Sequence, residues 1–251
     1  MKTFTRSFML LGALALSLIG SRASAADVFN HLSLAVTAGS DGIGGEIAMP
    51  VTKVFALRLG GNYMPQIKLK TNLSRPKWRE DWDRVEIEGK TSWKQFKALL
   101  DIYVWPAHGF HFTAGLYVAP REVVKIQNPV PVVDDEGNGR TDLGFIFGDY
   151  ILYPDQNGMF SARVLTKGLR PYLGLGFGRA IPKRRVNFTF DAGVQLWGTP
   201  KLYASDGKGG EYHLENKDAE EINIKSGSLM RKLSKIRCYP SITLRLAGRI
   251  F

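Results

Sequence analysis

The stretch Val-Asn-Phe-Thr-Phe-Asp-Ala-Gly-Val-Gln-Leu-Trp-Gly, residues 186–198, alternates strictly between two kinds of side chain. One parity is apolar and consists of Val186, Phe188, Phe190, Ala192, Val194 and Leu196. The other parity is polar or small and consists of Asn187, Thr189, Asp191, Gly193 and Gln195. Because successive side chains of a strand point to opposite faces, the pattern predicts a strand with one apolar and one polar face. Such a strand suits a membrane β-barrel, whose outside meets lipid, and also a soluble β-sandwich.

The N-terminus has the layout of a secretory signal peptide. Lys2 and Arg6 precede an apolar run over residues 8–19, and Ala23-Ser24-Ala25 supplies small residues at a cleavage position. The apolar run is too short for a helix that spans a bilayer, which needs about 20 residues. We therefore expect residues 1–25 to be a signal peptide and residues 26–251 to form one exported domain.

Seven further segments show the same alternation, at residues 32–38, 43–49, 55–63, 92–105, 110–119, 171–179 and 241–250. The connectors 50–53, 106–109 and 180–185 are short, and three others are long, at 64–91, 120–170 and 199–240. Short and long connectors alternate, apart from a short one at 39–42, as in outer-membrane barrels with short turns on one side and long loops on the other. The sequence thus predicts an all-β fold, an eight-stranded antiparallel transmembrane β-barrel. A hairpin formed by residues 148–153 and 159–164 would make ten strands possible.

The predicted strands can be paired as antiparallel hairpins in registers that keep their apolar faces on the same side of the sheet. Ala38 would face Ile43, Met49 would face Phe55, and Val104 would face Phe110. These registers place Ala35 opposite Glu46, Glu46 opposite Arg58, and Asp101 opposite Thr113. Each pairing matches face to face, which is what fixes register in a sheet with distinct faces.

The polar parity defines a predicted lumen that carries charges of both signs. An eight-stranded barrel is just wide enough for side chains to fill it, and charges held there must pair. We expect a polar network that closes the lumen, and the alternative is a narrow ion or small-solute channel. The predicted network consists of Glu46, Arg58, Lys97, Asp101, Asp191, Gln195, Arg245 and Arg249, with Asn62, Thr113, Thr189 and Thr243 among them.

Aromatic residues lie near the ends of the predicted strands and suggest girdles at the membrane interfaces. They are Tyr63, Trp93, Tyr103, Trp105, Tyr172, Trp197 and Tyr239.

Signals for catalysis, metals or cofactors are weak. His31, His108 and His111 map to the side with the short turns, and His213 lies in a long loop near acidic residues without a clear triad. Residues 134–142 are acidic like a calcium loop, but Phe145 stands where the closing Glu should be. Cys238 is the only cysteine, so neither a disulfide nor a cysteine metal site is expected. We expect no enzyme activity, no cofactor and no metal, and a lipid-modifying enzyme remains a further alternative.

The partners suggested by the sequence are lipids. The net charge is +11, and the segment 64–91 interleaves Trp78 and Trp82 with basic residues such as Lys68 and Lys70. Such a loop suits the phosphates of lipopolysaccharide, although acidic residues in the same segment dilute its charge. Nucleic acid is an implausible partner for an exported chain.

The run Pro171-Tyr172-Leu173-Gly174-Leu175-Gly176-Phe177-Gly178, followed by Phe190-Asp191-Ala192-Gly193-Val194, resembles strands of the OmpA-type outer-membrane β-barrel superfamily. The ending from Cys238 to Phe251 resembles that of small barrels of Bacteroidetes type. The resemblance implies a Gram-negative outer-membrane location and insertion by the barrel assembly machinery, with Phe251 as the assembly signal, and it implies no catalytic residue. The expected role is structural or surface-binding.

Overall fold

The computed structural model describes residues 31–73, 85–105, 108–134, 136–139, 145–147, 150–205, 211–214 and 237–250. The predicted signal peptide lies outside these residues, as does Phe251. Within the described residues, no helix is long and apolar enough to cross a membrane.

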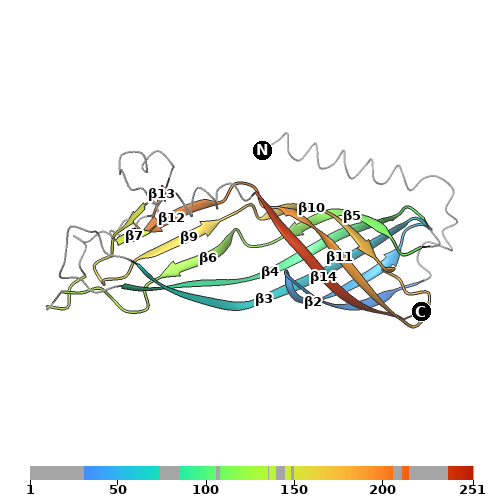
Figure 1. The fold of residues 1–251 in the computed structure, drawn as a ribbon, viewed down its shortest axis with the longest axis horizontal. Helices are drawn as coiled ribbons and strands as arrows, with labels where there is room; N and C mark the ends of the chain where they lie inside the picture. The colour runs from blue at the N-terminus through green and yellow to red at the C-terminus, as the bar shows by residue number, and fades with distance from the viewer. Residues whose placement is uncertain are drawn as a thin grey trace.

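Eight antiparallel strands close into a ring, which confirms the predicted fold class (Figure 1). Each strand is hydrogen-bonded to the next, and β14 closes the ring onto β1. In their order around the ring, the strands are β1 (Ser33–Gly39), β2 (Gly42–Pro50), β3 (Phe55–Leu73), β4 (Val85–Tyr103), β5 (His111–Val118), β10 (Leu169–Phe177), β11 (Val186–Leu196) and β14 (Cys238–Arg249). Closure leaves no free sheet edge within the ring, which is what a spanning β structure requires.

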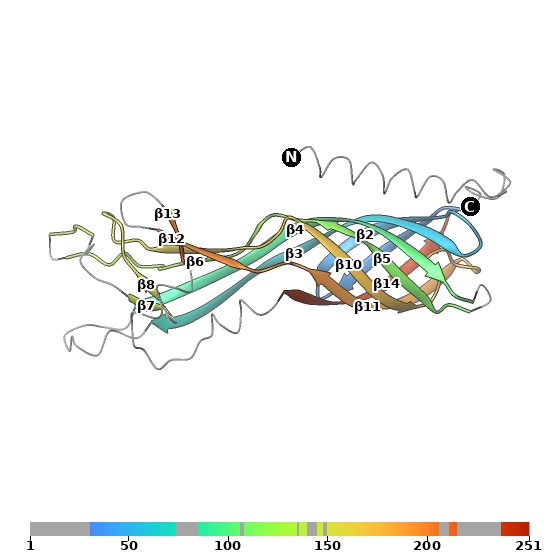
Figure 2. The same cartoon turned by 90° about the horizontal axis from the view of Figure 1, so that it is seen from above.

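The two ends of the barrel differ. At one end, here called the turn end, three short connectors at 51–54, 104–110 and 178–185 join the strands. The other end is the loop end. There β3 and β4 continue well past the ring as a long hairpin, which is visible in both views (Figures 1 and 2).

An extension sheet stands on the loop end and fills much of what the sequence suggested to be loops. It contains β6 (Glu122–Gln127), β9 (Ser161–Leu165), β12 (Lys201–Ser205) and β13 (Glu211–Leu214), in the order β3-β4-β6-β9-β12-β13. Its buried apolar side chains are Ile87, Val123, Ile126, Phe160, Ala162, Leu202 and Ala204. The segments 64–91, 120–170 and 199–240, which were predicted to be loops, therefore contain strands, and these strands form a sheet with its own buried apolar side chains.

The predicted hairpin of 148–153 with 159–164 is wrong. Tyr150–Leu152 (β8) pairs instead with Phe145–Phe147 (β7), and β9 pairs with β6 and β12. The tight turn at Asp155 does exist, because the Gly158 and Met159 amides donate to Asp155. β9 pairs with two strands that are distant in sequence and not with the nearby β8. Which strands pair over such a distance is determined by the tertiary structure.

Two of the three strand registers predicted from the sequence are confirmed. Ala38 lies opposite Ile43, and Asp101 lies opposite Thr113. The β2–β3 register is shifted by two residues, so that Met49 faces Leu57 and Glu46 faces Gly60. Pro50 pairs with Ala56, so the turn lies one residue further along the chain than expected, and within it the Thr52 hydroxyl accepts hydrogen bonds from the Val54 and Phe55 amides. A shift of two preserves the faces, so the lipid-type surface is unaffected.

The outside of the ring is apolar in the manner that the alternation predicted. Every barrel strand contributes at least one large exposed hydrophobic side chain, as β4 does with Phe96. The others include Leu34, Val36, Ile43, Phe55, Leu59, Phe112, Leu173, Leu175, Phe177, Val186, Phe188, Leu244 and Leu246. A water-soluble monomer rarely exposes a contiguous apolar surface of this extent.

Candidate functional site

The inside of the ring is polar, the inverse of a soluble barrel. Seven of the eight residues predicted for the lumen lie buried inside the ring: Glu46, Arg58, Lys97, Asp101, Asp191, Gln195 and Arg245. The alternation dictates this placement, because each of them has apolar, outward-facing neighbours in the strand. The eighth, Arg249, is exposed, which corrects the prediction. It shares the inward parity but lies at the last position of β14, where a long side chain passes the rim and reaches water.

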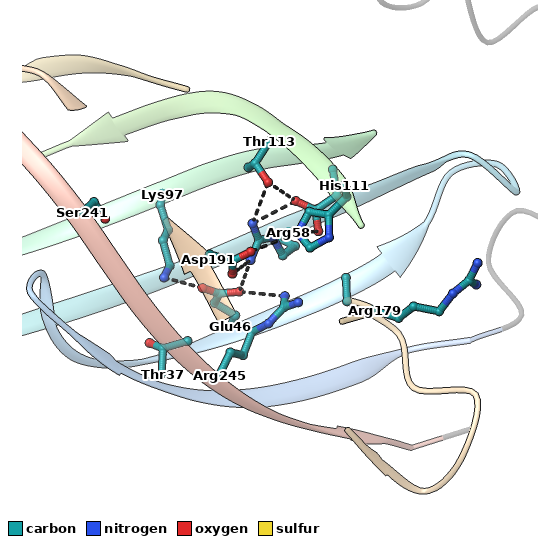
Figure 3. A network of polar contacts seen from close by, with 12 residues as sticks. Thr37, Glu46, Arg58, Lys97, His111, Thr113, Arg179, Asp191, Ser241 and Arg245 are labelled. Atoms are coloured by element: carbon teal, nitrogen blue, oxygen red, sulfur yellow. Dashed lines mark hydrogen bonds and ion pairs between the residues drawn. The ribbon is translucent and has the colours of Figure 1, made fainter. Parts of the chain in front are cut away.

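Arg58 of β3 is the centre of the network (Figure 3). Its Nη2 lies 2.8 Å from Asp101 Oδ1, and its Nη1 lies 2.8 Å from Asp191 Oδ2. Glu46 Oε2 is 3.6 Å from the same Nη1. Arg58 is 1% exposed, so these contacts are shielded from bulk water. One guanidinium thereby links carboxylates from β2, β4 and β11 across the barrel.

Glu46 of β2 is a second centre, with the opposite sign. Its carboxylate forms ion pairs with Lys97 of β4 and with Arg245 of β14, whose Nη1 lies 3.3 Å from Oε2. The core of the network thus holds three carboxylates (Glu46, Asp101, Asp191) and three basic side chains (Arg58, Lys97, Arg245). Equal numbers of opposite charges are what burial demands, because an unpaired buried charge is costly.

His111 belongs to this network, although the sequence prediction left it at the turn end. Its Nε2 lies 2.9 Å from Asp191 Oδ1, and its Nδ1 lies 3.0 Å from the Gly109 carbonyl oxygen. Both ring nitrogens thus lie within hydrogen-bonding distance of an oxygen, one on Asp191 and the other on the β4–β5 connector. The sequence contained a signal for this position, because His111 lies two residues before Thr113 and therefore points to the same, inward face of the strand.

Glycines on the inward parity leave room for these large side chains. A Cβ at Gly176 of β10 would collide with the Asp191 carboxylate and the His111 ring. A Cβ at Gly60 would lie 2.7 Å from the Glu46 side chain. The polar face of these strands therefore has glycine where the neighbouring strand contributes a charged group.

The turn end of the lumen is closed by an apolar cap. The β10–β11 connector folds over the opening and buries Ala180 against Ala48, Ala56 and Tyr103. The Ala180 amide donates to the Tyr103 hydroxyl at 2.8 Å, and Ser33 Oγ donates to the Ala180 carbonyl at 2.7 Å. Tyr103 is therefore an internal residue and not part of an aromatic girdle.

Two more layers fill the lumen toward the loop end. Leu99, Tyr117 and Tyr172 form a buried cluster next to the charges. Beyond them the Asp41 carboxylate accepts from Ser241 Oγ at 2.5 Å and from Gln195 Nε2 at 3.0 Å. The sequence prediction missed Asp41 because it lies in the short β1–β2 turn.

An aromatic stack completes the filling at the loop end. Trp197 stacks on Tyr239 with ring centroids 4.5 Å apart, and Trp93 meets both rings edge-on. The Arg170 guanidinium lies 4.3 Å from the centroid of Trp197. Of the predicted girdle, Trp93, Tyr103 and Tyr172 point inward, whereas Tyr63 and Trp105 are exposed on the outside.

Within the described part of the chain, no group of three or more His, Cys, Asp or Glu side chains is placed to hold a metal ion. In the acidic segment at 134–142, Asp134 accepts hydrogen bonds from the Glu136 and Asn138 amides. The side chain of His213 lies outside what the structure describes.

The fold and interior described above are those of an eight-stranded transmembrane β-barrel. A crystal structure of CarO2 from Acinetobacter baumannii is similar, with 16% sequence identity and a TM-score of 0.50 over 88% of this chain and 99% of that chain. CarO from the same organism gives 14% identity and a TM-score of 0.44, over 86% and 96% of the two chains. A major outer membrane protein from Thermus thermophilus gives 11% and 0.36, over 88% and 98%. No protein-family model matches the chain, and no curated protein matches it. At this identity, the likeness to CarO2 concerns the fold alone.

Proposed function

We propose that this protein is an integral outer-membrane β-barrel whose lumen is closed and whose function lies on its extracellular extension. In this proposal the turn end faces the periplasm, residues 1–25 direct export, and the barrel assembly machinery inserts the chain. The carrying observation is the inverted polarity of the ring, with exposed apolar side chains outside and the Arg58 network inside. Lipid is the solvent in which that distribution is stable.

The layered filling supports a closed lumen. An apolar cap, an ion-pair network, a tyrosine cluster and an aromatic stack follow one another along the barrel axis. An ion crossing this path would have to break buried pairs such as Arg58 with Asp101, whose separation leaves uncompensated charge.

The extension supports a surface-binding role. One register row across its sheet reads Lys68, Lys90, Lys125 and Arg163, on four neighbouring strands. Glu88 and Glu122 lie close to this row and pair with its cations. We infer that the row contacts the phosphates of lipopolysaccharide, which Lys and Arg recognise through charge-assisted hydrogen bonds.

The proposal assigns no catalytic residue, cofactor or metal. The relationship to the OmpA-type superfamily is also part of it, and it is supported by the glycine-rich β10, in which Gly176 makes room for the network.

A narrow channel is the second candidate. Among the described residues, several buried polar atoms in the lumen have no hydrogen-bond partner, including both amide atoms of Gln95, the Nη2 of Arg245 and the hydroxyl of Thr189. Buried polar groups of this kind are ordinarily satisfied by water, and a continuous chain of water would conduct.

Single-channel recording of the purified protein in a planar lipid bilayer separates the two candidates. With insertion verified by protection from protease, the closed barrel predicts no discrete current steps. Steady, discrete steps would favour the channel. Their ion selectivity should then change in Lys97→Gln and remain unchanged in the control Arg249→Gln, because Arg249 is exposed at the rim.

A further inference from the structure

An open aromatic cleft lies on the outside of the barrel at the turn end. It has a volume of about 800 Å³, and its lining consists of Trp105, His108, Gly109, Phe110, Phe177 and Gly178. The Phe110 ring centroid lies 6.2 Å from that of Trp105 and 5.2 Å from that of Phe177. Trp105 is 56% exposed and Phe177 is 60% exposed, so these rings are available to an apolar partner.

A second, basic cleft adjoins the first. It has a volume of about 280 Å³, and its lining includes Arg179, Lys183 and Arg184. Gly109 and Gly178 line both clefts and form the wall between them. There the Gly178 amide donates to the Gly109 carbonyl at 3.0 Å, and a Cβ on Gly109 would come within 2.9 Å of the Gly178 nitrogen. The two glycines thus hold the β4–β5 and β10–β11 connectors together.

The charge at this end has one sign. The described residues at 31–32, 51–54, 104–105, 108–110, 178–187 and 249–250 include no Asp and no Glu. The same residues include six cations: Lys53, Arg179, Lys183, Arg184, Arg185 and Arg249. The extension at the opposite end mixes both signs, with pairs such as Lys70 and Glu86. A rim of a single sign attracts a partner of the opposite sign.

Arg179 is held in place at this end. Its guanidinium lies 5.3 Å from the centroid of the Tyr103 ring, in the cap that closes the lumen. Figure 3 shows its side chain extending away from the Arg58 network toward the turn end. A guanidinium held by an aromatic ring loses less freedom when it binds a phosphate.

We propose that the two adjoining clefts form a binding site for an anionic phospholipid. The acyl chain lies against Trp105, Phe110 and Phe177, and the phosphate is bound by Lys183, Arg184 and Arg179. A molecule with an anionic group joined directly to an apolar chain matches both clefts at once, and basic pockets at a membrane surface select such head groups. This inference rests on the proposed membrane location and adds a lipid of the periplasmic leaflet to it.

Quenching of tryptophan fluorescence by brominated lipid tests the site, because Trp105 lies in the cleft. The purified protein is reconstituted in phosphatidylcholine vesicles that contain increasing fractions of brominated phosphatidylglycerol or brominated phosphatidylcholine. We expect brominated phosphatidylglycerol to quench at lower fractions, with a preference of about fivefold for each basic side chain that engages the phosphate. Trp105→Phe should remove the component of the quenching that shows the preference.

Charge variants provide the matched comparison. Lys183→Gln/Arg184→Gln should reduce the preference for phosphatidylglycerol, whereas Lys94→Gln/Lys201→Gln, with the same charge change at two exposed positions toward the loop end, should retain it. Equal quenching by both lipids in a protein that floats with the vesicles would overturn the phospholipid site and leave the membrane location intact. A protein that fails to float would overturn the membrane location and the site together.

Discussion

Removing the cation at the centre of the lumen should be costly, and the structure shows which carboxylate loses its partner. In Arg58→Met, Glu46 still has Lys97 and Arg245, and Asp191 still has His111. Asp101 keeps only the Thr113 hydroxyl at 2.9 Å, with His111 Nε2 3.8 Å away. Leaving one buried carboxylate without its partner should cost about 3–5 kcal/mol of unfolding free energy.

The companion variant removes the stranded charge as well. Arg58→Met/Asp101→Asn should recover most of the loss and lie within about 2 kcal/mol of the native protein, because a neutral amide is much cheaper to bury. Urea unfolding in lipid vesicles, followed by tryptophan fluorescence, measures both, and Arg249→Met is the control for losing an exposed arginine. A loss below about 1 kcal/mol in Arg58→Met, or no recovery in the double variant, would refute this account of the network.

Four other expectations concern individual side chains. His111→Gln should destabilise the barrel by about 1–3 kcal/mol in the same urea assay, because Asp191 loses a charge-assisted hydrogen bond. Gly176→Ala should impair folding, seen as loss of the heat-modifiable band on gels, while Gly45→Ala, whose Cβ would find its nearest atom at 3.7 Å, should fold normally. Phe160→Ala should make the extension sensitive to protease and leave the barrel intact, since this fully buried ring contributes about 3–5 kcal/mol to its packing. Desolvation raises the pKa of Glu88, but the nearby Lys90 and Lys68 have the larger effect and lower it below the usual 4.5. The ion pairs of Glu88 should therefore be intact at pH 4.5 and above and be lost only as the pH falls through the lowered pKa. An NMR titration midpoint at or above 4.5 would contradict this.

The alternation of apolar and polar residues was enough to predict most of the barrel. Alternation in segments such as 186–198 predicted the strands, the outward apolar residues and most of the buried charges, because a period of two assigns each side chain to a face regardless of distant context. It failed where parity stops being informative. Arg249 lies at a strand end, Asp41 lies in a turn, and Trp93 and Tyr172 are aromatic residues whose type suggested the membrane interface although their parity pointed inward.

The sequence did not allow pairing between strands that are not consecutive to be predicted. β9 has neighbours from β6 and β12, about 40 residues away in each direction, and short polar strands carry little information about such pairing. The extension was consequently expected to be loops. The same holds for the β2–β3 register, where the turn lies one residue further along the chain and the pairing is therefore shifted by two residues.

The sequence by itself determined that this protein is a barrel with an apolar outside and a charged inside, because both follow from local alternation. Only the tertiary structure decided which charges meet, since Arg58, Asp101 and Asp191 come from three strands that closure of the ring brings together. Closure likewise placed the β10–β11 connector over the lumen and joined Gly109 to Gly178 at the turn end. Contacts across a closed ring depend on strand number and stagger, and these are properties of the whole sheet that no single segment encodes.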